Sequence, residues 1–167
     1  IVGSHAGISV GEDGATHQCC EDIALMRTIP GMVILNPCDH YEMQAAVRAA
    51  VEHKGPCYIR LGRLAVESIN NNDDYKFELG KGITLREGTD ITVVATGLMV
   101  QEAVKAADAL KEEGISVEVI NIHTIKPLDE ELVIASAKKT GRVITVEEHN
   151  IIGGLGEAVS TALSEHC

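Results

Sequence analysis

The sequence has few aromatic residues, fewer basic than acidic residues and no long apolar run. Its 167 residues include three tyrosines, one phenylalanine and no tryptophan, so few side chains are available for stacking on nucleic-acid bases. The 14 Lys and Arg against 25 Asp and Glu give a net charge of −11, which disfavours nucleic acid and anionic lipid as partners. No apolar run approaches the roughly 20 residues of a membrane-spanning helix, and no basic-then-apolar leader opens the chain. Because 45% of the residues are hydrophobic, we expect a globular protein with a buried core. The charge, the few aromatic residues and the short apolar runs lead us to expect no nucleic-acid or membrane partner.

Cysteine occurs without a pattern that indicates disulfides or a metal centre. The number of cysteines, five, is odd, and their positions show no paired spacing. Adjacent Cys19 and Cys20 are poorly placed to bind one tetrahedral metal ion. We therefore interpret all of them as reduced core thiols of a cytoplasmic protein. They are Cys19, Cys20, Cys38, Cys57 and Cys167.

The first third of the chain predicts a strand, a helix and a strand. Residues 32–35 form a short apolar run that is typical of a buried strand. Residues 39–52 carry apolar side chains at steps of three and four, with Asp39 as the expected N-cap and Glu42 as its capping partner. A second buried strand is predicted at 57–59.

Two further segments complete the predicted organisation. Ile1-Val2-Gly3 is interpreted as the end of another buried strand, so we expect the chain to begin inside a domain. Residues 62–78 lose periodicity and include a run of Asn and Asp at 70–74 that can bury almost nothing, which predicts a linker at 64–78.

Strands alternate with helices again after this linker. The predicted strands and helices, in chain order, are 91–95, 100–110, 117–122, 129–139, 143–146 and 155–163. This alternation predicts an α/β fold with a parallel or mixed sheet flanked by helices. We expect a C-terminal three-layer α/β domain at 79–167, preceded by a partial domain at 1–63.

The loop at 5–18 concentrates the polar chemistry of the chain. It holds two histidines, two carboxylates and three glycines between the first predicted strand and a helix. Loops at the carboxyl ends of parallel strands often bind ligands, so we predict a site for a hydroxyl-bearing ligand, with a histidine as donor or general base and Asp13 as acceptor. Two alternatives remain: Asp13 and Thr16 only cap the next helix, or His5, Asp13 and His17 bind a metal ion, although their spacing is not diagnostic.

Two smaller polar clusters lie near the C-terminus. Gly153-Gly154-Leu155-Gly156 opens a predicted helix and either binds an anion through free N–H groups or forms a tight, closely packed turn. Glu147-Glu148-His149 follows a predicted strand and either faces a cleft or is a solvated strand end.

Several motifs of the chain occur together in one known family. In chain order they are His5, Gly11-Glu12-Asp13-Gly14-Ala15-Thr16-His17-Gln18, Asp22, Met26-Arg27-Thr28-Ile29-Pro30-Gly31-Met32, Pro37 with Asp39, Glu42, Gly55-Pro56, Tyr58-Ile59-Arg60, Thr124-Ile125-Lys126-Pro127-Leu128-Asp129, and Glu147-Glu148-His149 with Gly153-Gly154. Over essentially the whole chain they resemble the thiamine-diphosphate-dependent transketolase family. Residues 1–63 resemble the C-terminal part of its pyrimidine-binding (central) domain, and residues 79–167 resemble its C-terminal domain. The resemblance is closest to the C-terminal subunit of a transketolase split over two chains, truncated within the pyrimidine-binding domain.

The resemblance implies a role for each polar residue of the loop. His17 matches the histidine that hydrogen-bonds the C1 hydroxyl and carbonyl oxygen of a ketose donor. Asp13 matches the aspartate that reads the hydroxyl next to the reacting carbonyl, and His5 matches a histidine near the substrate phosphate. The resemblance implies that either Arg60 or Arg63 holds this phosphate, and we favour Arg60. Ala15 departs from the family pattern, which commonly has proline there.

The resemblance also implies cofactors and partners. The family binds thiamine diphosphate with Mg²⁺, but its aminopyrimidine-binding glutamate and aromatics lie upstream of the His5 loop, and the motif of its diphosphate-binding domain is absent here. We therefore expect no cofactor-binding or metal-binding residue in this chain. We expect a partner, the diphosphate-binding N-terminal subunit, and a homo-oligomer such as a dimer.

The activity that the resemblance implies is transfer of a two-carbon ketol unit between sugar phosphates, in the pentose phosphate pathway. This chain alone is expected to be inactive. The alternatives are a non-catalytic assembly module, or a fragment of a deoxyxylulose-phosphate synthase or of a 2-oxo-acid dehydrogenase beta subunit, which share these domains.

Overall fold

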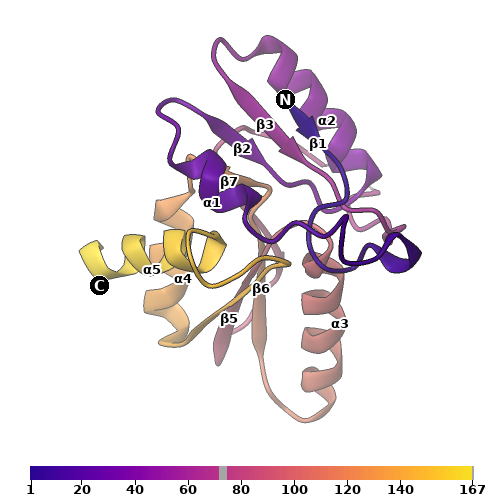
Figure 1. Ribbon diagram of the computed structural model, residues 1–167. Helices are drawn as coiled ribbons and strands as arrows, with labels where there is room; N and C mark the ends of the chain where they lie inside the picture. Colours follow the sequence, from indigo (N-terminus) through magenta and orange to yellow (C-terminus); the bar gives the residue numbers. More distant parts are fainter. Residues whose placement is uncertain (72–74, 167) are drawn as a thin grey trace.

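The computed structural model describes residues 1–71 and 75–166, and their strands form two four-stranded sheets (Figure 1). The first sheet has the order β1-β3-β2-β7. Its strands are β1 (Val2–Gly3), β3 (Cys57–Arg60), β2 (Val33–Leu35) and β7 (Thr124–Lys126). The first three strands are parallel, whereas β7 is antiparallel to β2. The carboxyl ends of β1, β2 and β3 therefore lie at the same end of this sheet.

The second sheet has the order β4-β6-β5-β8 and helices on both faces. Its strands are β4 (Ile83–Arg86), β6 (Val117–Asn121), β5 (Ile91–Ala95) and β8 (Val143–Val146). Strand β5 is parallel to β6 and β8, and β4 is antiparallel to β6. Helix α3 (Met99–Glu112) covers one face, and α4 (Glu130–Thr140) and α5 (Leu155–His166) cover the other (Figure 1). The predicted α/β fold with mixed sheets flanked by helices is confirmed.

Two of the helices, α2 (His40–Glu52) and α4, begin where the sequence predicts N-caps. In α2, the Asp39 side chain accepts a hydrogen bond from the Glu42 N–H at 2.9 Å. In α4, the Asp129 side chain accepts from the Leu132 N–H at 3.3 Å. Each cap satisfies an N–H group that the first helical turn cannot pair internally. The remaining helices of the first segment are short, namely α1 (Asp22–Arg27) and the 3₁₀ helix η1 (Gly11–Asp13).

Alternating side chains of the second sheet pack against opposite helical layers. Val119 belongs to the apolar cluster under α3, whereas Val94 and Ile120 belong to the cluster that includes α4 and α5. The second cluster also contains Ile23 and Ile34 of the first segment. The two sheets thus share one core, and burial of apolar surface common to both stabilises their arrangement.

Two strands were not predicted from the sequence, and one prediction of burial was wrong. Strands β4 and β7 lie outside the predicted elements. The opening residues form a strand as predicted, but Ile1 is 74% exposed and Val2 is 61% exposed. The reason is that β1 lies at the edge of the first sheet, where only β3 neighbours it.

The predicted linker at 64–78 is more buried than its composition indicates. Asn70 is only 2% exposed, and its N–H donates to the Asp39 carboxylate at 2.6 Å. The Tyr75 hydroxyl donates to Glu42 at 2.9 Å, and the Asn121 amide donates to the same carboxylate at 2.7 Å. The expectation that this stretch buries almost nothing is therefore corrected at Asn70, because the buried carboxylates of Asp39 and Glu42 supply acceptors for polar groups of the stretch. Residues 72–74 of the polar run lie outside the described residues.

Burial raises the pKa of the Glu42 carboxyl, and the hydrogen bonds that it accepts act in the opposite direction. Cys38, next to this carboxylate, is buried as predicted, and burial raises the pKa of its thiol. Cys19, Cys20 and Cys57 are only partly buried free thiols, and Cys167 lies outside the described residues. Within the described residues, no helix combines the length and apolar character needed to cross a membrane.

Candidate substrate-binding site

Four of the predicted site residues lie together where β1 and β3 end. His5 follows β1, and Arg63 follows β3, which is paired with β1. The Asp13 carboxylate lies between them: its Oδ2 accepts from Arg63 Nε at 2.8 Å and lies 3.5 Å from His5 Nε2. The ring of His17 has its centroid 5.9 Å from that of His5. The loop cluster of His5, Asp13, His17 and Arg63 therefore combines two imidazoles, a carboxylate and a guanidinium.

Local hydrogen bonds orient the two imidazole rings. His17 Nδ1 lies 3.0 Å from Thr16 Oγ1 and 3.2 Å from the Asp13 carbonyl oxygen. His5 Nδ1 lies 3.0 Å from Ser4 Oγ. Since Nδ1 is engaged in both rings, Nε2 is the nitrogen of His17 that is available to a ligand.

The cluster is accessible to solvent. Arg63 and His17 are exposed, and His5 and Asp13 are half-buried. The helix-capping alternative is contradicted, because the N-cap of α1 is Glu21 and no side chain caps it. Asp13 and Thr16 instead order the loop itself.

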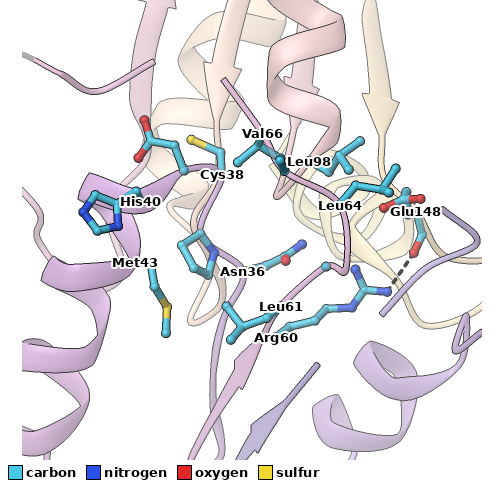
Figure 2. A pocket seen from close by; sticks show the side chains of 14 residues that line it. Asn36, Cys38, His40, Met43, Arg60, Leu61, Leu64, Val66, Leu98 and Glu148 are labelled. Carbon is cyan, nitrogen blue, oxygen red and sulfur yellow. Dashed lines mark hydrogen bonds between the residues drawn. The ribbon is translucent and has the colours of Figure 1, made fainter. Parts of the chain in front are cut away.

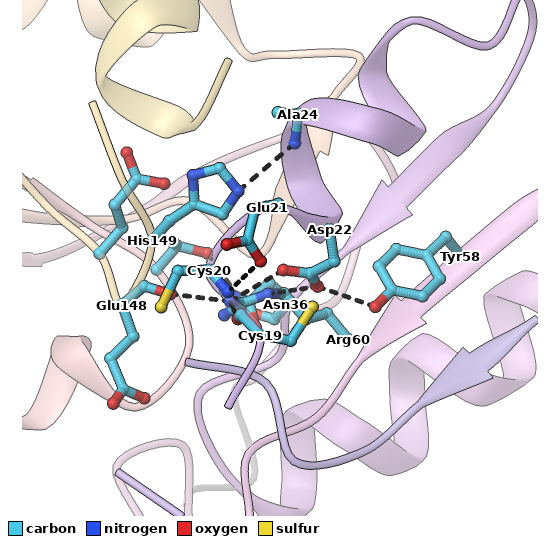
Figure 3. Close-up of polar contacts among 12 residues, drawn as sticks. Cys19, Cys20, Glu21, Asp22, Ala24, Asn36, Tyr58, Arg60, Glu148 and His149 are labelled. Atoms are coloured by element: carbon cyan, nitrogen blue, oxygen red, sulfur yellow. Dashed lines mark hydrogen bonds and ion pairs between the residues drawn. The ribbon is translucent and has the colours of Figure 1, made fainter. Parts of the chain in front are cut away.

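Arg60 lies in a different, buried cluster (Figure 3). It is 3% exposed, and its Nε donates to Asp22 Oδ2 at 2.8 Å while its Nη2 donates to Asp22 Oδ1 at 3.2 Å. The same Nη2 donates to the Glu148 carbonyl oxygen at 2.7 Å. The Tyr58 hydroxyl also donates to Asp22, at 2.8 Å. The guanidinium of Arg60 thus joins α1, β3 and the segment after β8.

Burial alone would raise the pKa of Asp22, but the hydrogen bonds and positive charge of Arg60 outweigh burial and hold that pKa below its ordinary value. Burial and the Asp22 carboxylate raise the pKa of Tyr58, so this hydroxyl is a donor at neutral pH. The buried cluster is therefore an ion pair with a neutral phenol as an additional donor.

One face of Arg60 borders a cavity between the two sheets (Figure 2). The cavity has a volume of about 380 Å³ and lies beyond the ends of β2 and β3, against the start of α3. Its walls include Asn36, Met43, Leu61, Leu64, Val66 and Leu98. None of the residues that line it belongs to the loop cluster. Arg60 and the loop cluster therefore face different spaces.

The two C-terminal polar clusters have defined partners. Glu147 accepts hydrogen bonds from the N–H groups of Leu155 at 2.7 Å and Gly156 at 2.9 Å. The start of α5 thus already holds an anion, which is the carboxylate of Glu147. Glu148 faces the loop, since its Oε1 accepts from the Ser9 N–H at 3.0 Å. The solvated-strand-end interpretation is contradicted for both glutamates.

The described residues do not form a site for a metal ion or for a diphosphate that carries one. Within residues 1–71 and 75–166, no group of three or more His, Cys, Asp or Glu side chains is arranged to hold a metal ion. The loop cluster offers imidazole and guanidinium donors around a single carboxylate, a set that suits hydroxyl and phosphate groups of a ligand. The residues present therefore do not fit thiamine diphosphate with Mg²⁺.

Comparison with known sequences gives matches over both segments. The transketolase pyrimidine-binding domain matches residues 1–68, and the transketolase C-terminal domain matches residues 80–167. A protein of Methanocaldococcus jannaschii described as a transketolase C-terminal section is 50% identical over 99% of this chain and 52% of its own length. One subunit of an apulose-4-phosphate transketolase from Phocaeicola vulgatus is 45% identical over 99% of this chain and 53% of its own length. The chain thus spans about half the length of the curated relatives that it matches.

Comparison with solved structures agrees. A split-gene transketolase, described as an inactive β4 tetramer, has a TM-score of 0.90 and 47% identity over 99% of this chain and 53% of its own. A Pichia stipitis transketolase variant in complex with fructose 6-phosphate has a TM-score of 0.73 and 27% identity over 90% of this chain and 23% of its own. Two domain matches that together cover almost the whole chain, and relatives that match it nearly end to end, show that this protein belongs to the transketolase family.

Proposed function

We propose that this chain is the substrate-recognising part of a two-chain transketolase that transfers a two-carbon ketol unit between sugar phosphates. The observation that carries the proposal is the loop cluster. In it the carboxylate of Asp13 contacts both His5 and Arg63, and His17 lies beside His5. Its donors and acceptors match a ligand with several hydroxyls and a phosphate. The relatives named as sections or subunits of transketolases support the two-chain arrangement.

Each residue of the loop cluster has a distinct role in this proposal. His17 Nε2 hydrogen-bonds the C1 hydroxyl and carbonyl oxygen of the ketose donor, because Nδ1 is already engaged by the loop. Asp13 accepts a hydrogen bond from the hydroxyl next to the reacting carbonyl. A donor without that hydroxyl leaves the carboxylate poorly satisfied and binds less well in the transition state. His5 contributes a donor near the far end of the sugar.

Arg63, and not Arg60, is the proposed phosphate ligand. Arg60 is buried and already donates to Asp22 and to backbone carbonyls. Arg63 has a side chain that is 40% exposed and pairs with two carboxylates of the loop, Asp13 at 2.8 Å and the exposed Glu12 at 3.7 Å. A guanidinium in that setting can take up a phosphate in bidentate geometry at little cost to the fold.

Thiamine diphosphate and Mg²⁺ enter the proposal through the partner, a diphosphate-binding N-terminal subunit. The cofactor of this family supplies the electron sink for ketol transfer. The residues of this chain bind and orient the sugar against it. Two relatives are named for transketolases of different sugars, apulose 4-phosphate and 6-deoxy-6-sulfo-D-fructose, so the proposal is confined to ketose donors with an anionic group at the far end.

The proposal is tested in the enzyme assembled with its diphosphate-binding subunit. His17→Ala is expected to lower kcat/KM for ketol transfer by about 100-fold or more, because general acid–base and hydrogen-bonding groups contribute roughly 10²–10⁴-fold. His166→Ala is the matched control, because His166 is an exposed histidine at the end of α5, far along the chain from the loop. Full activity of His17→Ala would contradict the site assignment, and absence of ketol transfer by the wild-type assembly would contradict the proposed activity.

A second function, assembly of subunits, is proposed for residues 79–167. Ile151 is 93% exposed and Ile152 is 71% exposed on the turn between β8 and α5, which is costly for adjacent apolar side chains unless another surface covers them. The similar split-gene structure is a tetramer. Ile151→Asp with Ile152→Asp is expected to lower the oligomer mass in sedimentation equilibrium, and an unchanged mass would contradict this role.

A further inference from the structure

Residues 148–150, shortly after β8, contact the 5–18 loop and the residues that follow it. Glu148 accepts a hydrogen bond from the Ser9 N–H at 3.0 Å, and His149 Nε2 accepts from the Ala24 N–H at 3.4 Å. The Asn150 amide donates to the Cys20 carbonyl oxygen. Three consecutive residues of the C-terminal half thus hold backbone groups of the loop or of the residues that follow it, and Figure 3 shows the contact between His149 and Ala24.

Glu148 also packs against the point where the loop closes. Gly7 and Cys19 form an antiparallel bridge, with hydrogen bonds of 2.7 and 3.1 Å between their backbone groups. Gly7 has a φ of +83°, and a Cβ at that position would lie 2.7 Å from the Cβ of Glu148. The glutamate side chain therefore lies directly on the Gly7 backbone, and glycine is required there by conformation and by space.

The carboxylate of Glu148 is an unusual partner for the loop. Ser9 lies inside the loop, between the Gly7–Cys19 bridge and the 3₁₀ helix that ends at Asp13. Its Oγ is buried without a hydrogen-bond partner among the described residues, and its backbone N–H is held by Glu148. Hydrogen bonds to an ionised carboxylate are roughly twice as strong as neutral ones.

We propose that Glu148 is a positioning residue of the substrate loop: it fixes the backbone at Ser9 and thereby keeps the loop cluster in the arrangement that binds the sugar. The inference rests on the proposed function of the loop. Glu148 acts through the backbone and touches no substrate. The C-terminal segment then contributes to catalysis as well as to assembly, because small displacements of substrate-binding groups slow enzymatic reactions strongly.

The test compares two adjacent glutamates whose carboxylates accept from different backbone N–H groups. Glu148→Ala removes the contact to the loop, and Glu148→Gln keeps an oxygen acceptor for the Ser9 N–H. Glu147→Gln is the matched control, since Glu147 holds the N–H groups of α5 and not the loop. All variants are measured in the assembled two-chain enzyme by hydrogen exchange of the peptide that covers 5–18, and by kcat and KM for a ketose-phosphate donor.

In Glu148→Ala, exchange of the loop peptide is expected to accelerate about 10-fold and kcat/KM to fall about 10-fold, as loss of one charge-assisted hydrogen bond allows. Glu148→Gln is expected to recover both to within about three-fold of wild type. Glu147→Gln is expected to lower the thermal midpoint by a few degrees and to leave loop exchange and kcat/KM unchanged.

Wild-type loop exchange and kcat/KM in Glu148→Ala would overturn the inference, and so would equal effects of the Glu147 and Glu148 variants. If the wild-type assembly shows no ketol transfer, the proposed function fails by itself. Hydrogen exchange then still decides whether Glu148 orders the loop.

Discussion

Two arginines three positions apart on the same stretch of chain have opposite surroundings. Arg60 lies within β3, is 3% exposed and is held by Asp22, Tyr58 and backbone carbonyls. Arg63 lies beyond the end of β3, has a side chain that is 40% exposed and pairs with Asp13 in the loop. Both are ion pairs with an Nε–oxygen distance of 2.8 Å. The two pairs differ in their exposure to solvent: water screens the Arg63–Asp13 pair, whereas the Arg60–Asp22 pair is buried.

This difference separates a residue that holds the fold from one that can bind a ligand. A buried charge whose partner is removed is left without water to replace it, so Arg60 and Asp22 depend on each other. An exposed pair contributes little to stability, and its members can exchange partners. In the proposed function, a substrate phosphate takes Arg63 from Asp13. Arg60 borders the cavity but already donates to Asp22 and to the Glu148 carbonyl oxygen, so a phosphate there would have to displace these partners.

The largest expected effect comes from removing the buried arginine. Arg60→Ala leaves the Asp22 carboxylate unpaired under the sheet, and we expect the free energy of unfolding to fall by about 3–5 kcal/mol. Urea denaturation of the variant and of wild type measures this loss. A loss below about 1 kcal/mol would show that the buried cluster is not what joins α1, β3 and the segment after β8.

The next effect concerns the acceptor of the loop cluster. Asp13→Ala is expected to lower kcat/KM of the assembled enzyme by roughly 10–1000-fold for a donor with a hydroxyl next to the carbonyl, as one to three hydrogen-bond equivalents are lost. A donor lacking that hydroxyl should lose much less. Equal losses for both donors would show that Asp13 supports the loop and Arg63 without reading the sugar.

A smaller effect is the dependence of the buried pair on pH. Because the pKa of Asp22 is held below its ordinary value of 3.8, the unfolded chain takes up a proton at this carboxyl before the folded chain does. The stability that Asp22 contributes is complete above that value and is lost as the pH falls through the folded pKa. We expect the difference in unfolding free energy between wild type and Asp22→Asn to be constant above about pH 5 and to shrink below pH 3.8. A difference that does not change between pH 5 and pH 2 would contradict the lowered pKa.

The smallest expected effect on stability is that of the exposed arginine. Arg63→Ala should change the free energy of unfolding by less than about 1 kcal/mol. In the assembled enzyme it should raise KM for a phosphorylated donor more than for an unphosphorylated one, and Arg63→Lys should recover part of this loss. A stability loss comparable to that of Arg60→Ala would abolish the distinction between the two arginines.

Features that depend on neighbouring residues, such as helix starts, could be predicted from the sequence. Features that depend on contacts between distant residues could not. The starts of α2 and α4 follow from Asp39 and Asp129, whose caps operate within three residues. The loop cluster was predicted because its polar residues are dense and resemble a known family. Strand β7 could not be predicted, since Thr124-Ile125-Lys126 is not an apolar run like that of β2 and its partner β2 is about 90 positions away.

The choice between the arginines was also beyond the sequence. Alternation along a strand indicates which side chains share a face, but Arg60 is distinguished by Asp22, which comes from another element. The burial of Asn70 was misjudged for the same reason, because its N–H donates to Asp39, the N-cap of α2.

The pairing of β7 with β2 means that the outer edge of the first sheet is supplied by residues from beyond the linker. An exchange of modules that replaces the chain beyond residues 64–78 removes β7 and leaves the backbone groups of Ile34 and Leu35 that face it without partners. Bare strands of this kind recruit one another and aggregate. The two domain matches are separated at the linker. In a chimaera that takes the first from this protein and the second from a distant relative, the foreign sequence has to supply strand β7 of the first sheet.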